Sequence, residues 1–100
     1  MEEKVATLLV YDSFQLESKN IFIIYGDLEI ESDREVTSGM NIHISFNSSF
    51  SISEKIHAVE YLRKDGREYS AICLKYEDSE ELEMIKALNI SEETCEIYSA

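Results

Sequence analysis

The sequence predicts an all-β fold, a small antiparallel six-stranded β-barrel that forms one domain over residues 1–100. Three observations predict it. Apolar and polar residues alternate with a period of two along most of the chain. Short turn-forming segments separate the alternating stretches. One segment alone, DSEELEMIKAL, has helical spacing, and it predicts one short helical turn near residues 79–88.

The first half of the chain contains three expected strands. ATLLVYDSFQLES is the first, and NIFIIYGDLEIES is a long second strand with Leu28 and Ile30 facing inward. Gly26 lies within the second strand, where glycine is typical of a bulge or a bend. The third strand, MNIHISF, follows Gly39, which we expect to adopt a positive φ and to set the register of the strand.

The second half begins with NSSFSISE, a Ser/Asn-rich segment that we expect to be a loop. KIHAVEYLRK is the fourth strand, with a β-bulge near His57–Ala58, because Ile56 and Val59 are three residues apart. Asp65-Gly66 indicates a tight primed hairpin turn before EYSAICLKY, and ETCEIYS closes the chain as the sixth strand. In the helical segment, Asp78 is the expected N-cap.

The order of these segments resembles the second domain of translational GTPases such as elongation factor Tu, a β-barrel that follows the GTP-binding domain. Tyr25-Gly26 falls at the strand glycine of that family, and SGMNIHI falls at the glycine before its Val-x-Ile strand. IHAVEYLRKDG is similar to the family's VxSIExxxK strand and turn, and SAICLKYEDSEELEMIKAL to its VGLxLxGxxxxDIxRGxVL. The resemblance covers about residues 5–98 and implies the translation-factor barrel. The chain contains no GxxxxGK(S/T) loop, so we expect no GTP binding.

The charge of the chain points to the kind of partner. Nine basic and 21 acidic residues give a net charge of −12, which repels phosphate backbones and disfavours nucleic acid as a partner. A basic protein partner fits this charge, whereas a merely solvated acidic face is the alternative. The expected protein-binding residues are the acids near the C-terminal end: Asp78, Glu80, Glu81, Glu83, Glu92 and Glu93.

The N-terminus carries two acids where a signal peptide needs positive charge, and the longest apolar run, IFIIY, is too short to cross a bilayer. We therefore expect a cytoplasmic protein without a membrane partner. Cys73 and Cys95 fit that setting as reduced, buried thiols, because neither belongs to a CxxC pair.

Residue patterns that carry chemistry are scarce, so we expect no catalytic residues, no metal and no cofactor. His43 and His57 lie on separate expected strands, and abundant carboxylates make their proximity to acids uninformative. Asp12 and Glu60 are single acids within strands, for which solvent-facing or turn roles are favoured over acid–base roles. Four tyrosines are candidates for a base-stacking platform, but the one basic cluster lies at the hairpin tip: Tyr11, Tyr61, Tyr69 and Tyr76, with Arg63, Lys64 and Arg67.

Two functions follow as hypotheses. The first is a noncatalytic acidic binding module that recognises another protein, for example as an inhibitor or immunity-type protein that covers a basic enzyme. The second is a translation-associated factor that acts on the ribosome or on a translation factor, which rests on the resemblance alone. An enzyme comes third. The sequence leaves open the partner's identity, the biological process, the oligomeric state and any small ligand.

Overall fold

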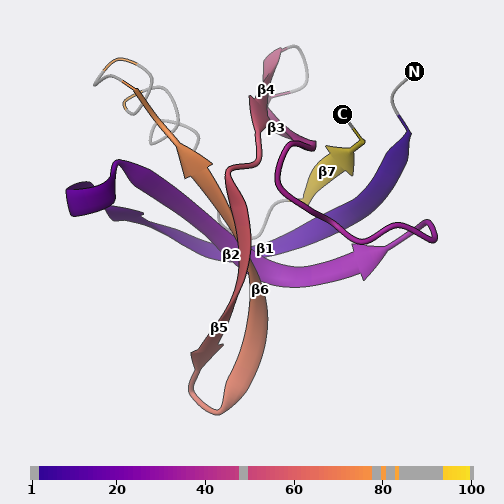
Figure 1. Ribbon diagram of the computed structural model, residues 1–100, viewed down its shortest axis with the longest axis horizontal. Coiled ribbons are helices and arrows are strands. Elements are labelled where there is room, and N and C mark those ends of the chain that lie inside the picture. The colour runs from indigo at the N-terminus through magenta and orange to yellow at the C-terminus, as the bar shows by residue number, and fades with distance from the viewer. Residues whose placement is uncertain (1–2, 48–49, 78–79, 81–82, 84–93, 100) are drawn as a thin grey trace.

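A computed structural model describes residues 3–47, 50–77, 80, 83 and 94–99 (Figure 1). The strands form a single sheet in the order β4-β3-β7-β1-β2-β6-β5, and every neighbouring pair is antiparallel. The described part of the chain is therefore mostly β, in agreement with the expected class. The elements are β1 (Lys4–Leu16), the 3-10 helix η1 (Glu17–Lys19), β2 (Ile21–Ile30), β3 (Asn41–Asn47), β4 (Phe50–Lys55), β5 (Ala58–Lys64), β6 (Arg67–Lys75) and β7 (Thr94–Tyr98).

The helical turn expected at residues 79–88 falls almost entirely outside the described residues, which include only Glu80 and Glu83 of it. Within the described part of the chain, no helix is long and apolar enough to span a bilayer.

The number of strands differs from the prediction, because the described residues form seven strands rather than six. The additional strand is β4, which lies in the segment that was expected to be a Ser/Asn-rich loop. Its residues pair with β3, with Ile52 opposite Ile44 and Ser51 opposite Ser45. Serine has only a weak preference for turns, so pairing with a neighbouring strand can determine its conformation.

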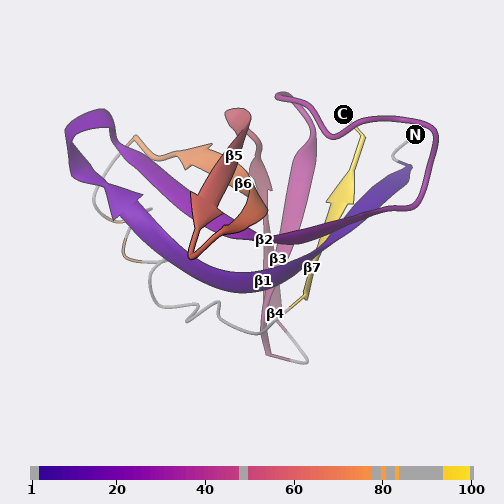
Figure 2. The ribbon, with the colours of Figure 1, turned by 90° about the horizontal axis from the view of Figure 1, so that it is seen from below.

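The sheet also does not close into the expected six-stranded barrel, since its order ends at β4 and β5. These two edge strands are nevertheless consecutive in the chain, and only Ile56 and His57 lie between them. Because a chain advances at most about 3.6 Å per residue, the Cα atoms of Lys55 and Ala58 are within about 11 Å of each other. The two edges therefore approach each other at this corner, and the sheet is strongly curved (Figure 2).

The chain changes its partner at this corner. The Ile56 N–H donates to the Met40 carbonyl at 2.8 Å, and the Gly39 N–H donates to the Ile56 carbonyl at 2.9 Å. The next residue bonds to β6, because the His57 N–H donates to the Cys73 carbonyl at 2.8 Å. Ala58, the first residue of β5, is itself opposite Cys73, and the β5–β6 register runs without a shift from there to the turn, so the β-bulge expected near His57–Ala58 stays a prediction.

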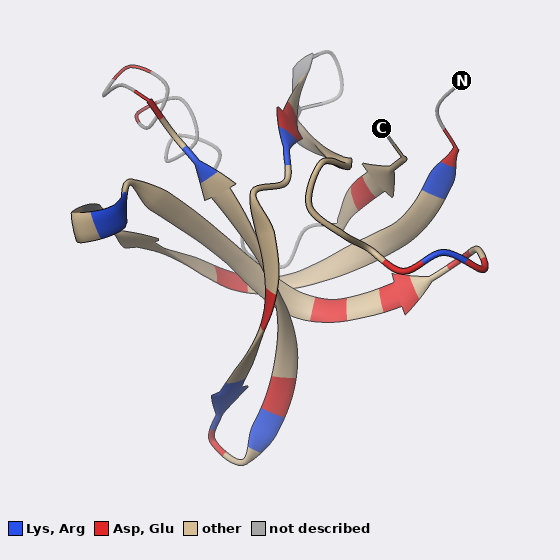
Figure 3. Cartoon of the chain, viewed as in Figure 1, with Lys and Arg blue, Asp and Glu red and all other residues tan. Residues whose placement is uncertain are grey.

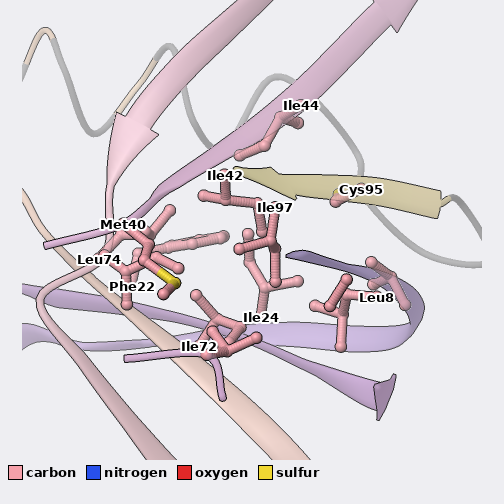
Figure 4. Packing of buried hydrophobic residues seen from close by; sticks show 14 of the residues in the cluster. Leu8, Phe22, Ile24, Met40, Ile42, Ile44, Ile72, Leu74, Cys95 and Ile97 are labelled. Atoms are coloured by element: carbon pink, nitrogen blue, oxygen red, sulfur yellow. The ribbon is translucent and has the colours of Figure 1, made fainter. Parts of the chain in front are cut away.

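The concave face of the sheet holds the main core, here called the inner cluster (Figure 4). Ile42 of β3 and Leu74 of β6 belong to the same cluster although three strands separate them in the sheet, so the curvature brings distant strands together. Burying each aliphatic side chain contributes roughly 1.5–3 kcal/mol. The members with less than 2% exposure include Val5, Leu8, Ile24, Ile42, Ile44, Ile56, Ile72, Leu74, Cys95 and Ile97.

The opposite face carries a smaller group, here called the outer cluster, from β2, β5 and β6. Antiparallel sheets commonly have one face packed on the core and the other face in water. Here a second cluster packs on the other face, which explains why IFIIY is apolar on both faces. Its buried members are Ile23, Tyr25, Tyr69, Ala71 and Cys73, with Ile21, Ala58 and Leu62 packed against them.

Two of the expected turns have the expected backbone. Gly39 has a φ of 92°, so it supplies the positive φ before β3. Asp65 and Gly66 have φ values of 54° and 78°, and positive φ at both central residues is the mark of a type I′ hairpin turn.

Candidate binding cleft

Two hairpins of the sheet diverge from a common point. The β2–β6 ladder ends at the pair Gly26 and Ser70. Beyond it, β2 continues to Ile30 beside β1, whereas the β5–β6 hairpin leads away from it (Figure 1). Arg67 bridges the two arms through a salt bridge with Asp27, whose charge raises the pKa of the Arg67 guanidinium.

On the inner face, this divergence opens a cleft of about 370 Å³. β2 contributes Leu28 and Ile30 to it, and β5 contributes Val59 and Tyr61. Ile30 is 49% exposed and Tyr61 is 74% exposed, so solvent reaches both side chains in the cleft. The remaining lining residues are Ser70 of β6 and the segment 32–36, which connects β2 toward β3.

The segment 32–36 forms one wall of the cleft and is attached to the core at its end. Val36 is only 8% exposed and belongs to the inner cluster. Nearer its start, the Arg34 N–H donates to the Ser32 hydroxyl at 3.1 Å, which is a local turn interaction. Asp33, Arg34 and Glu35 are exposed on this wall, so two carboxylates and one guanidinium lie beside the apolar side chains of the cleft. The Arg34 Nε lies 4.0 Å from the Glu3 carboxylate, and the segment shows both charge colours in Figure 3.

Glu31 follows β2 directly, and its side chain is held by β1 outside the cleft. The Thr7 hydroxyl donates a hydrogen bond to the Glu31 carboxylate, and the Lys4 ammonium lies 3.2 Å from the same oxygen. The Thr7 hydrogen bond, followed by the interactions with Lys4, lowers the pKa of Glu31. This carboxylate is therefore ionised at neutral pH.

The structure does not assemble the four tyrosines into one platform. Tyr69 and Tyr76 are buried, at 7% exposure each. Tyr11 lies on the outer face, stacked on Tyr69 with 5.2 Å between ring centroids, whereas Tyr61 lines the inner cleft.

The basic residues beside Tyr69 are engaged within the protein. The Lys64 ammonium donates to the Tyr25 hydroxyl at 3.3 Å, which raises the pKa of Lys64. Arg67 lies over the Tyr69 ring at 5.0 Å and pairs with Asp27. These contacts support cross-strand packing on the outer face.

Of the six acidic residues expected to bind a protein, the structure describes two. Glu80 and Glu83 are exposed. The other four expected binding residues lie outside the described residues: Asp78, Glu81, Glu92 and Glu93.

The structure separates the histidines and cysteines considered for chemistry. His43 packs on Tyr98 with 4.4 Å between ring centroids, whereas His57 lines a second hollow of about 530 Å³ at the β4–β5 corner. Cys95 is in the inner cluster and Cys73 is in the outer one, so they lie on opposite faces of the sheet. The described residues contain no group of three or more His, Cys, Asp or Glu side chains that could hold a metal ion.

Asp12 and Glu60, the two single acids considered for acid–base chemistry, lie in surroundings that favour structural or solvent-facing roles. The Asp12 carboxylate accepts a hydrogen bond from the Ser13 N–H at 2.8 Å, next to the bulge of β1. Glu60 is exposed on the outer face. Burial, followed by the charge of Glu60, raises the pKa of Cys73, so this thiol is protonated at neutral pH and is a poor nucleophile.

Sequence reasoning missed the cleft as a site. Leu28 and Ile30 were expected to face inward as core residues, and they do line the inner face, but Ile30 is half exposed. The segment 32–36 is polar apart from Val36, and no pattern in its sequence predicts the wall of a cleft. Val36 within this otherwise polar segment was the one sequence signal for a wall anchored to the core.

In its described part the chain is a mostly β protein whose curved sheet has a hollow lined by apolar and charged side chains. In comparisons with known proteins, no protein-family model, no curated protein and no solved structure matches this chain.

Proposed function

We propose that this protein is a noncatalytic binding module that recognises a basic protein partner through the cleft between β2 and β5. The observation that carries this proposal is the exposure of Ile30 and Tyr61 in a cleft whose wall holds the charged side chains of Asp33, Arg34 and Glu35. A large apolar side chain at the centre of a contact, with polar groups around it, is the usual arrangement of an interface anchor.

The energetics favour an apolar anchor with electrostatic steering. Burying one large apolar side chain of a partner contributes roughly 1.5–3 kcal/mol, which is too little for stable binding by itself. The net charge of −12 accelerates the approach of a basic partner and repels acidic ones. An inhibitor or immunity-type protein that covers a basic enzyme would use both effects.

A second candidate is a translation-associated factor with a barrel of the elongation-factor type. The course of β4 and β5 favours it, because Ile56 bonds on the β3 side and His57 bonds on the β6 side. If β4 and β5 are regarded as one bent strand, that strand pairs with β3 at one end and with β6 at the other. The sheet would then have six strands and its two edges would be joined, as in a barrel. Such a factor would copurify with ribosomes or with an elongation factor.

The experiment compares two variants with the same change in charge. Tagged wild-type protein, Asp33→Asn/Glu35→Gln and Glu80→Gln/Glu83→Gln are each used as bait in a lysate of the native cell at moderate salt, and bound proteins and RNA are identified. One basic protein that is bound near stoichiometrically, released by high salt and lost with the Asp33/Glu35 variant supports the cleft.

Two other outcomes contradict this proposal. Loss of the partner only with the Glu80/Glu83 variant would move the interface to the acidic residues near the C-terminal end. Ribosomal proteins, tRNA or an elongation factor in the bound fraction would favour the translation-associated role instead.

A further inference from the structure

The strand β5 has one side that no strand of the described chain pairs with. It runs from Ala58 to Lys64, pairs with β6 on one side, and ends the order of the sheet. Unpaired strand edges expose rows of N–H and C=O groups that can accept another strand. Proteins often protect such edges with proline, and this chain contains no proline.

The turn determines which backbone groups of β5 point outward. In a hairpin with a two-residue turn, the pair that flanks the turn exchanges both hydrogen bonds, and here that pair is Lys64 and Arg67. Hydrogen-bonded and non-bonded pairs then alternate along an antiparallel ladder. Val59, Tyr61 and Arg63 therefore direct their N–H and C=O groups away from β6. None of the three takes part in the backbone hydrogen bonds found outside the ladders of the described residues.

The unpaired side of β5 faces the region of the cleft. At the start of this side, Ile56 is still bonded to Gly39 and Met40. Beyond Ile56 no ladder continues between β5 and the chain that precedes β3, and the segment 32–36 instead forms the cleft wall facing Val59 and Tyr61. The side chains of Val59 and Tyr61 thus line the cleft, while their backbone groups lie on the open edge.

We propose that the partner binds by adding an extended strand to the open edge of β5, with its apolar side chains in the cleft and its basic side chains beside the carboxylates. This rests on the proposed function and specifies how the partner binds. In binding by strand addition, backbone hydrogen bonds supply affinity, and pockets for alternate side chains supply specificity. Val59 and Tyr61 provide both features at the same two positions.

The charges near β5 favour a basic segment over a second copy of this chain. Lys64 and Arg67 are engaged by Tyr25 and Asp27 on the outer face. In the cleft wall, Asp33 and Glu35 are accompanied by Arg34, whose Nε lies 4.0 Å from the Glu3 carboxylate, and Glu60 is exposed on the other face of β5. Arg63 is an exposed cation of β5 itself. Two copies of the chain would each bring a charge of −12 to the contact and repel each other, whereas the same net charge attracts a lysine-rich strand.

The test uses a defined peptide, acetyl-Lys-Val-Lys-Val-Lys-Val-Lys-amide, titrated into the ¹⁵N-labelled full-length chain and followed by NMR. The expected result is saturable shifts at Val59, Tyr61 and Arg63 and slowed hydrogen exchange of their amides. The matched peptide with glutamate in place of lysine should bind at least tenfold more weakly. No saturable shift at β5 with the lysine peptide would overturn the proposal.

Two N-methylated peptides test for strand pairing itself. In one the valines are methylated, and in the other the lysines are. Alternate N–H groups of a strand point to opposite sides, so only one of the two peptides should lose at least tenfold in affinity. Loss with methylated valines indicates an antiparallel strand, and loss with methylated lysines indicates a parallel one. Equal binding of both peptides overturns strand addition.

A pair of protein variants provides an independent readout. Arg63→Pro removes an outward N–H without removing a ladder donor, and proline is tolerated at such edge positions. Arg63→Thr makes the same change in charge and keeps the N–H. We expect Arg63→Pro to bind the lysine peptide at least fivefold more weakly than Arg63→Thr, with both variants folded by NMR. Equal affinities would contradict the proposal.

The results distinguish failure of this proposal from failure of the proposed function. One outcome is that both N-methylated peptides bind as tightly as the lysine peptide, whereas Asp33→Asn/Glu35→Gln abolishes binding. This outcome would support the cleft as the binding site and overturn strand addition. Another outcome is that hydrogen exchange at Val59, Tyr61 and Arg63 slows as the protein concentration rises, with no peptide present. This would show that a second copy of the chain occupies the edge, and it would overturn the assignment to a partner segment.

Discussion

Gly26 of β2 packs directly against the backbone of Leu9 in β1. A Cβ atom at position 26 would lie 1.9 Å from the Leu9 carbonyl oxygen. The adjacent register of the β1–β2 ladder shifts between Val10 and Asp12, so Tyr11 is the additional residue of a β-bulge. The glycine thus permits close approach at a bulge that belongs to the partner strand.

Gly26→Ala should destabilise the fold strongly because backbone, not a flexible side chain, occupies the space. Overpacking a core costs typically about 1–3 kcal/mol, and we expect at least about 3 kcal/mol here. Urea unfolding followed by tyrosine fluorescence measures it. Gly39→Ala is the control, since nothing lies within 4 Å of a Cβ there and only the φ of 92° is strained, which costs about 1–2 kcal/mol. A larger loss for Gly39→Ala would contradict the packing argument.

Local patterns predicted the regular parts of this fold well. The alternation that places Leu28 and Ile30 on the inner face, and the Asp65-Gly66 turn, depend on neighbouring residues alone. The strand β4 was missed because pairing with β3, rather than the intrinsic preference of its serines, determines its conformation.

The curvature of the sheet and the cleft depend on contacts between distant residues. The partner exchange at Ile56 and His57 follows from bonds to Met40 and Cys73, and no local pattern encodes these. The cleft arises because two hairpins separate after Gly26, which a single strand pattern does not reveal. The acidic residues near the C-terminal end lie mostly outside the described residues, so that predicted site stays a prediction.

The cleft and the core should respond differently to the same substitution. Ile72 is fully buried, and Ile72→Ala should cost about 2–5 kcal/mol of unfolding free energy. Ile30 is 49% exposed, and Ile30→Ala should cost less than about 1 kcal/mol. Urea titrations of both variants provide the comparison. If Ile30→Ala were as destabilising as Ile72→Ala, then Ile30 would be a core residue and not an available anchor.

Replacing Thr7 by valine should return the pKa of Glu31 toward its ordinary value of 4.5, because the Thr7 hydrogen bond is the largest cause of its lowered pKa. A carboxyl group with a lowered pKa in the folded state adds stability above its unfolded pKa, and this stability is lost as the pH falls through the folded pKa. NMR titration of the Glu31 carboxyl group measures the shift directly. Thr94→Val, at an exposed position of β7, is the control, and an unchanged Glu31 titration in Thr7→Val would refute the assignment.

The two cysteines should react slowly with a thiol reagent in the folded protein. Cys73 is 5% exposed and Cys95 is 1% exposed, and burial raises the pKa of Cys73 above its ordinary value of 9.0. Because the thiolate is the reactive form and access requires opening, labelling at pH 7 should be at least about 100-fold slower than in the urea-unfolded chain.

Glu60 supplies a test of the electrostatic part of this effect. Its charge is the second cause of the raised pKa of Cys73, so Glu60→Gln should increase the thiolate fraction and speed the labelling of Cys73 at pH 9. The background is Cys95→Ala, so that only Cys73 can react. Glu68→Gln removes one exposed charge from β6 and serves as the matched control. Equal labelling rates in the two glutamine variants would assign the protection of Cys73 to burial alone.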